Sequence, residues 1–246
     1  MKNSFFSIAT LSVLIASTSS FAAQITPSPL VAPEFSKGVN QGRVEVVYIN
    51  YEDVYGGGVQ GTKRFALSDT FALTPSLGVY HLAGDHSYTD NIAGQVNLDK
   101  DYTFASGGLR AEVQKKFEPV NFILFGGGLL HYGKSKDTTT STNFGAENTK
   151  STDKGLGWEA GIQAAMKTGP FTTILFYRYD EMRVDTKNED DTGTVDTDQK
   201  FTFTSSTVGV DLLFQNGISL SALYGMLDNE EGQDTDITML KLGYSF

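Results

Sequence analysis

Residues 237–246, at the end of the chain, read ITMLKLGYSF. Successive side chains of an extended strand point to opposite faces. One face of this strand carries Leu240, Leu242, Tyr244 and Phe246. The other face carries Lys241, Gly243 and Ser245. An apolar face opposite a polar one suits a wall between lipid and a polar interior, so the stretch predicts a membrane-spanning β-strand. The alternative is an ordinary edge strand that ends at Phe246.

The other end of the chain has the three parts of a secretory signal peptide. Lys2 is the only charge in residues 1–23, and a short apolar stretch follows it. That stretch cannot cross a bilayer as a helix, which takes about 20 residues. Small residues favour cleavage after Ala22, with Ala23 as the alternative, so residues 1–22 are the predicted signal peptide. Loss of Lys2 changes the formal net charge from −10 to −11.

Composition excludes several classes of protein. No segment approaches 18 consecutive apolar residues, which excludes a helical membrane protein. The mean hydropathy of −0.20 is typical of soluble chains, but a transmembrane barrel exposes only every second residue to lipid and has a similar average. Cysteine is absent, so there is no disulfide framework and no thiolate metal site. An acidic balance without a basic stripe argues against nucleic acid as a partner.

The rest of the chain divides into a tail and one domain. Residues 23–41 contain three prolines among polar residues, which favours an extended periplasmic tail. From residue 42 to 246, alternating runs are separated by two kinds of connection. Short turns are expected at residues 67–70, 117–120, 168–171 and 215–218. Long polar loops are expected at residues 83–101, 134–154 and 184–200. This alternation is typical of outer-membrane barrels, with short periplasmic turns and long extracellular loops.

The runs between these turns predict an all-β, antiparallel, up-and-down transmembrane barrel of ten strands. The predicted strands cover residues 43–51, 57–66, 71–82, 102–116, 121–133, 155–167, 171–182, 201–214, 218–227 and 236–246. An even number places both termini in the periplasm. The glycine-rich residues 53–58 make the first hairpin ambiguous, so eight strands are the alternative. The run NFILFGGGLLHY, residues 121–132, is apolar on both faces, and its periodicity does not orient it.

Two strand-turn-strand segments carry a family resemblance: GLRAEVQKKFEPVNFILFGGGLLHYGK, residues 108–134, and GWEAGIQAAMKTGPFTTILFYRYDE, residues 157–181. With the terminal phenylalanine, they resemble the small outer-membrane barrels of Gram-negative bacteria, the Ail/OmpX-like and porin-family proteins. The resemblance implies a monomer in the cell outer membrane, in contact with outer-membrane lipid and lipopolysaccharide. It also implies that the barrel assembly machinery recognises a signal formed by Leu242, Tyr244 and Phe246.

The predicted inner face carries ten charged residues, five of each sign. They are Glu45, Arg64, Arg110, Glu112, Glu159, Lys167, Arg178, Asp180, Asp211 and Lys241. The balance of charge predicts internal ion pairing. Two interpretations stay open, because the same residues can form a network that plugs the lumen or line a narrow polar pathway.

The chain offers no recognisable catalytic or metal site. Among the three histidines, only His131 with Ser135 and His86 beside Asp85 have candidate partners nearby, and neither pair matches a known outer-membrane hydrolase arrangement. Residues 188–199 come near the spacing of a calcium loop but lack the final bidentate glutamate. We therefore expect no enzyme activity, no cofactor and no metal ligand.

These observations predict a small porin-family protein with a narrow channel for small solutes. The alternative is a virulence-associated adhesion or resistance protein with a plugged lumen. In that case the polar loops would contact host or phage surface components.

Overall fold

A computed structural model describes residues 41–51, 54–90, 94–143, 145–190, 195–229 and 234–246. The predicted signal peptide and nearly all of the predicted tail lie outside these residues. Ten strands are present: β1 Gln41–Tyr51, β2 Val54–Ala66, β3 Phe71–Asp90, β4 Gly94–Phe117, β5 Val120–Ser141, β6 Gly145–Thr168, β7 Phe171–Asp190, β8 Val195–Phe214, β9 Ile218–Asn229 and β10 Asp234–Ser245.

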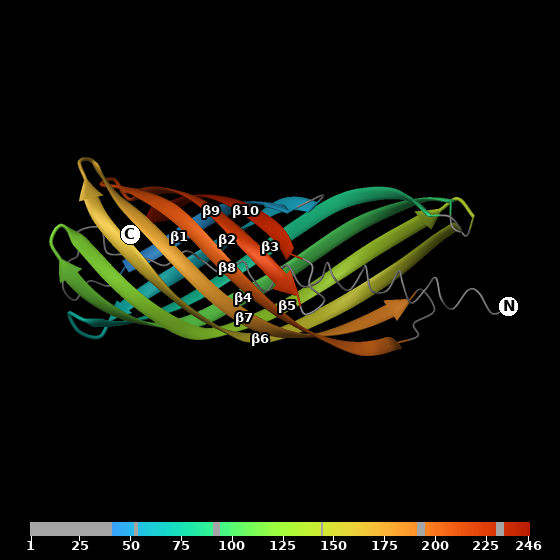
Figure 1. Ribbon diagram of the computed structural model, residues 1–246, viewed down its shortest axis with the longest axis horizontal. Helices are drawn as coiled ribbons and strands as arrows, with labels where there is room; N and C mark the ends of the chain where they lie inside the picture. The colour runs from blue at the N-terminus through green and yellow to red at the C-terminus, as the bar shows by residue number, and fades with distance from the viewer. Residues whose placement is uncertain (1–40, 52–53, 91–93, 144, 191–194, 230–233) are drawn as a thin grey trace.

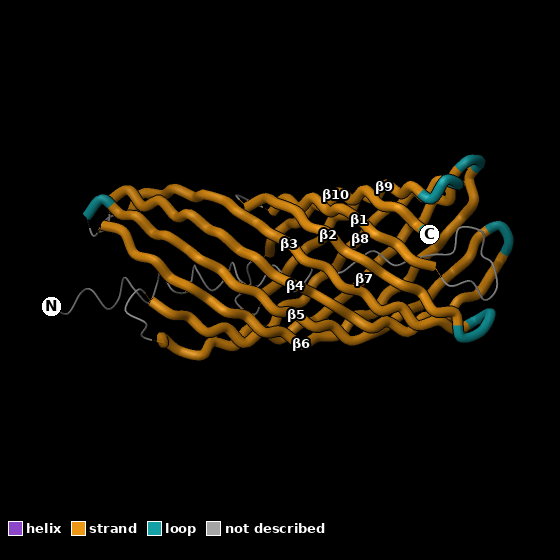
Figure 2. Tube along the Cα trace, turned by 180° about the vertical axis from the view of Figure 1, so that it is seen from behind, coloured by secondary structure: helices purple, strands orange, loops and turns teal. Residues whose placement is uncertain are grey.

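The ten strands form one closed barrel (Figures 1 and 2). Each strand pairs antiparallel with the next along the chain, and β1 closes the sheet against β10, with Arg43 opposite Ser245 and Tyr51 opposite Ile237. Closure leaves no unpaired edge strand, which is the condition for a β-sheet to lie in lipid. The prediction of a ten-stranded antiparallel barrel is confirmed, and the eight-stranded alternative is wrong.

The strands differ in length by about a factor of two. β1, β2, β9 and β10 have 11 to 13 residues, whereas β3 to β8 have 20 to 24. The long strands run past the others at one end of the barrel (Figure 1). We call this end the extended end. The opposite end holds the connections after β2, β4, β6 and β8, and we call it the short-turn end.

The prediction of long loops at residues 83–101, 134–154 and 184–200 is wrong. Most of these residues continue the strands, and Thr138, for example, pairs with Asn148 across the β5–β6 hairpin. The segments are rich in polar residues and carry few apolar ones, such as the buried Val96 and Leu98, so their composition resembles that of a loop. A hairpin that projects from the bilayer into water tolerates polar residues on both faces while its backbone hydrogen bonds continue.

The outer wall carries a continuous apolar surface, which we call the outer belt. Large apolar side chains alternate outward on every strand and are widely exposed, as Leu130 at 62% and Leu156 at 67% illustrate. Soluble monomers rarely expose contiguous apolar areas of this size, whereas lipid requires them. On β6, Leu156, Trp158, Ile162 and Met166 are all exposed and lie on this belt. No helix among the described residues is long and apolar enough to cross a membrane.

The inner wall carries an apolar layer toward the extended end. Sixteen buried residues form it, among them Val47, Tyr80, Phe104, Leu223 and Met239. Aromatic rings of this layer lie against glycines, because a Cβ on Gly78 would come within 2.3 Å of the Tyr80 hydroxyl and one on Gly133 within 2.2 Å of the Tyr102 hydroxyl. Glycine at these positions lets the rings lie along the wall.

Candidate functional site in the barrel interior

Charged side chains form a second layer of the interior, nearer the short-turn end than most of the apolar layer. On β1, Glu45 is followed toward the extended end by Val47 and Ile49, and on β10 Lys241 follows Met239. We call this set the charged layer. It contains five positive residues, Arg43, Arg64, Arg110, Arg178 and Lys241. It also contains five negative residues, Glu45, Glu112, Glu159, Asp180 and Asp211. All ten are 4% exposed or less.

The structure buries nine of the ten charged residues that the sequence places on the inner face. The tenth, Lys167, is exposed near the short-turn end of β6 and is not part of the layer. Arg43 belongs to the layer but is not among the predicted residues. It lies two positions before Glu45 on β1 and therefore on the same face, which is the signal that could have found it.

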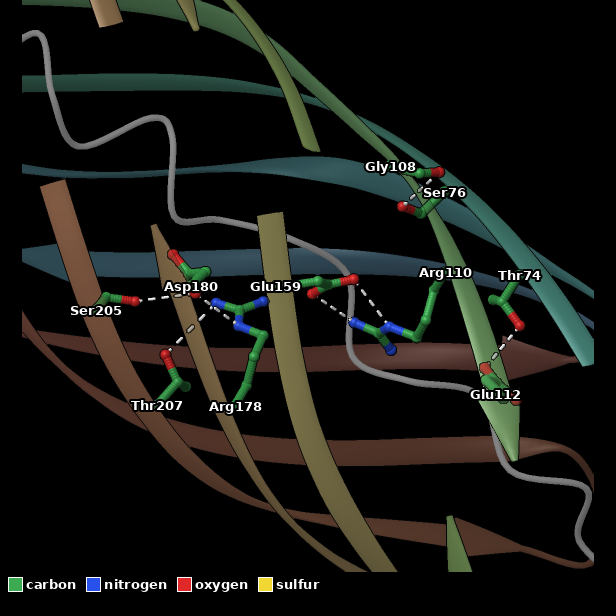
Figure 3. Close-up of polar contacts among 10 residues, drawn as sticks. All are labelled: Thr74, Ser76, Gly108, Arg110, Glu112, Glu159, Arg178, Asp180, Ser205 and Thr207. Atoms are coloured by element: carbon green, nitrogen blue, oxygen red, sulfur yellow. Dashed lines mark hydrogen bonds and ion pairs between the residues drawn. The ribbon is translucent and has the colours of Figure 1, made fainter. Parts of the chain in front are cut away.

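Arg110 and Glu159 make the best-defined ion pair of the layer (Figure 3). The Arg110 guanidinium donates from Nε and Nη2 to the two oxygens of Glu159, at 2.9 and 2.8 Å. The pair links β4 to β6 across β5, where the Phe125 ring lies 4.1 Å from the guanidinium carbon. A bidentate pair stacked on an aromatic ring is strongly oriented.

Glu112 is the centre of a second set of contacts. Arg64 Nε donates to it at 2.9 Å, and the Thr74 hydroxyl donates to its other oxygen at 2.6 Å. Arg64 also donates to the side-chain oxygen of Gln114 at 3.0 Å. These contacts link β2, β3 and β4, and both carboxylate oxygens of Glu112 accept a hydrogen bond.

The ion pair between Arg43 and Asp211 spans the most strands. Arg43 Nη2 donates to Asp211 at 2.7 Å, which joins β1 to β8 past the intervening β10 and β9. Ser221 donates to the other Asp211 oxygen at 2.9 Å. Glu45 lies 3.6 Å from Arg43 Nη1 and accepts a hydrogen bond from Gln60.

The fourth arginine pairs within its own strand. Arg178 Nε lies 2.9 Å from Asp180, and Ser205 on β8 donates to the same carboxylate at 3.0 Å (Figure 3). Arg178 also donates to Thr207 at 3.4 Å. Glu45 on β1 and Asp211 on β8 attract the ammonium group of Lys241 on β10, whereas Arg43 and Arg178 repel it. The charged layer therefore joins strands on all sides of the barrel.

Some buried polar atoms near the charged layer have no hydrogen-bond partner among the described residues. They include both side-chain amide atoms of Gln163 and the hydroxyls of Ser219 and Ser245. An unpaired buried polar group is costly, and ordered water ordinarily satisfies it. These positions suit water or a small polar solute.

A separate polar cluster lies toward the extended end. The Tyr102 hydroxyl donates to Asp153 at 3.0 Å and lies 2.9 Å from His131 Nε2. Thr186 donates to the other Asp153 oxygen at 2.7 Å. Ser135 was the candidate partner of His131 in the sequence, but the strand register brings His131 to Tyr102, which in turn contacts Asp153. Within the described ranges, no three carboxylate or histidine side chains converge in a metal-binding arrangement.

Asp137 lies beyond the outer belt, five positions past Tyr132 on β5. Burial raises the pKa of its carboxyl from 3.8 to about 7. Because the folded-state pKa is raised, the carboxyl stabilises the fold most below pH 4, and that contribution is lost as the pH rises through 7. We expect carbon-13 NMR of the carboxyl, assigned with Asp137→Asn, to give a midpoint near 7. A midpoint near 4 would contradict the burial of Asp137.

The comparisons with known proteins do not assign this chain to a family. No protein-family model matches the chain, and no curated protein matches it. Solved structures do match. A major outer membrane protein from Thermus thermophilus is 15% identical with a TM-score of 0.44, over 85% of this chain and 100% of that one. An outer membrane channel from Pseudomonas putida F1 is 15% identical with a TM-score of 0.43, over 89% and 100%. The Ail protein of Yersinia pestis is 13% identical with a TM-score of 0.32, over 84% and 96%. At these identities and scores the likeness does not assign a function.

Proposed function

We propose that this chain is an outer-membrane barrel of a Gram-negative bacterium with a plugged interior, acting at the cell surface through the extended end of its wall. The closed sheet and the outer belt support a place in lipid. The connections between strands are short at both ends, but β3 to β8 project past the outer belt at one end only. A wall that projects into water on one side supports an extended end outside the cell and both termini in the periplasm. The partners that we propose for the extended end are host or phage surface components.

The observation that carries this proposal is the pairing within the charged layer. Its ten buried charges are balanced in sign, and its four arginines are each bound to a carboxylate at 2.7 to 2.9 Å. Ion-selective pores instead present rings of one sign to water. The apolar layer that follows would strip the hydration shell from a passing ion, at a large cost in free energy.

A narrow passage for small polar solutes is the second candidate. The unpaired polar atoms of Gln163, Ser219 and Ser245 favour it, since they suit water inside the lumen. The two candidates differ in whether water continues through the apolar layer.

Single-channel recording of the refolded mature protein in a planar bilayer tests the proposal. We expect no discrete current steps from protein that is folded, as slower migration on gels after boiling would show, and whose insertion into the bilayer is confirmed separately. The double variant Arg110→Ser with Glu159→Ser is the matched comparison. It removes both charges of one ion pair and so loosens the packing of the charged layer without leaving a charge unpaired. Discrete wild-type openings that change in size with this variant would contradict a plugged lumen and support the narrow passage.

A further inference from the structure

The outer face of β5 to β8 carries a cluster of basic side chains beyond the outer belt. Its members are Lys134, Lys136, Lys150, Lys154, Arg183, Lys187 and Lys200, and all seven are exposed. We call this surface the basic face. It is unexpected in a chain with a formal net charge of −10.

Strand register places these side chains in rows. Lys136 on β5 lies directly opposite Lys150 on β6. Thr152 on β6 lies between Lys134 on β5 and Lys187 on β7. Like charges directly opposite each other destabilise an antiparallel pair of strands. Lys136 and Lys150 therefore weaken the hairpin unless an anion binds between them.

The acidic side chains of this face that the structure describes do not neutralise it. Among the described side chains, three acidic ones point outward from β5 to β8 in this region, namely Glu181, Asp185 and Glu189, against seven basic ones, which leaves a net charge of +4. Asp185 lies opposite Lys154 and Lys200, and Glu189 opposite Lys150. Among the residues that the structure describes, no carboxylate forms an ion pair with Lys134, Lys136, Lys150 or Lys154.

The rest of the wall at this level has the opposite sign. Among the described side chains, the exposed charged ones there are acidic and include Asp85, Asp99, Asp101, Asp228 and Asp236, on β3, β4, β9 and β10, while Lys100 on β4 is half-buried. Charge is therefore divided between two sides of the barrel. Charged residues that only kept the protein soluble would not need to be separated by sign in this way.

The basic face begins where the outer belt ends. Lys134 is the next outward position after Tyr132 on β5, about 7 Å along the strand, and Lys154 stands in the same relation to Leu156 on β6. At this distance from the apolar surface, a side chain meets the headgroups of the surrounding lipid.

We propose that the basic face binds the phosphate groups of a phosphorylated glycolipid of the outer leaflet, of the lipid A type, whose acyl chains cover the outer belt of β5 and β6. This inference rests on the proposed location and on the extended end lying outside. The lysines of β5 and β6 contact the phosphates, and Thr152 donates a hydrogen bond to one of them. The acidic side of the barrel binds this lipid only through bridging divalent cations.

Binding of bisphosphorylated lipid A to the folded mature protein in detergent micelles, measured by native mass spectrometry, tests this proposal. The test variant carries Lys134→Gln, Lys136→Gln, Lys150→Gln and Lys154→Gln. The matched control carries Lys63→Gln, Lys115→Gln, Lys116→Gln and Lys167→Gln, which removes the same charge at the short-turn end. We expect the test variant to bind on the order of tenfold more weakly or worse, and the control to bind like the wild type.

Several outcomes would overturn the proposal. They are equal binding by the test variant and the wild type, equal weakening by both variants, or equal binding of lipid A after its phosphates are removed. Phosphatidylglycerol bound as tightly as lipid A would overturn the assignment to a glycolipid. The gel shift on boiling and the bilayer recording do not depend on this lipid, so a failure here is distinguishable from a failure of the proposed plugged barrel.

Discussion

Glu159→Ala is expected to lower the free energy of unfolding by about 3–5 kcal/mol, because it leaves the Arg110 guanidinium buried without its partner. The double variant Arg110→Met with Glu159→Leu is expected to lose far less, since apolar residues of similar volume replace both charges and no charge remains unpaired. Denaturant titration of the refolded barrel in lipid vesicles measures both values, and the gel shift on boiling gives an independent measure of the folded fraction.

The exposed pair of Lys116 and Glu118, 2.8 Å apart at the short-turn end, is the control for this comparison. Lys116 lowers the pKa of the Glu118 carboxyl, but both side chains lie in water. Glu118→Ala should leave the unfolding midpoint unchanged, because solvent screens an exposed pair. Equal losses in the single and double variants of Arg110 and Glu159 would show that side-chain volume, and not charge pairing, holds the charged layer together.

Removal of Phe246 is expected to destabilise the closed barrel by about 2–4 kcal/mol and to abolish its heat-modifiable form in cells. The Phe246 amide donates to the Gly42 carbonyl at 2.9 Å, and the Gly42 amide donates back at 2.8 Å. These two hydrogen bonds extend the junction of β1 and β10 to the end of the chain. The Phe246 ring lies against Gly42, where a Cβ would come within 2.6 Å of it.

Phe246→Ala separates closure from recognition by the assembly machinery. It keeps both backbone hydrogen bonds and removes only the ring. We expect this variant to refold in detergent nearly as well as the wild type, but to accumulate unassembled in cells, if the terminal ring is part of the proposed assembly signal with Leu242 and Tyr244. Normal assembly in cells would contradict that role, whereas failure to refold in detergent would assign the ring to closure.

Period-two alternation was sufficient to predict the strands within the bilayer. Leu156 to Met166 alternate with small and polar residues because one face meets lipid, and that constraint is visible in any single strand. The alternation does not orient residues 121–132, because Ile123 and Leu129 face inward and are as apolar as Leu124 and Leu130 on the lipid side. Leu129 is buried in the apolar layer, and Ile123 in a separate cluster with Ala165, Ile174 and Leu213, so both depend on residues that neighbouring strands supply.

Composition led to a wrong prediction for the part of the barrel wall that extends beyond the membrane. Residues such as Thr138 and Asn148 lie in polar segments with the composition of a loop, yet they pair because the hairpin below them fixes the register. The ion-pair partners within the charged layer also could not be predicted from the sequence. The contacts of Arg43 with Asp211 and of Arg110 with Glu159 join residues on strands that are not neighbours, so they depend on the curvature of the closed sheet.

The unequal strand lengths also set the order in which the barrel comes apart. Nine residue pairs join β1 to β10, whereas twenty-two join β4 to β5. Separation at the β1–β10 junction breaks the fewest backbone hydrogen bonds, so we expect the activation barrier to opening to be lowest there. Unfolding under mechanical force would then begin by peeling β10 away from β1, and the long hairpins from β3 to β8 would separate last.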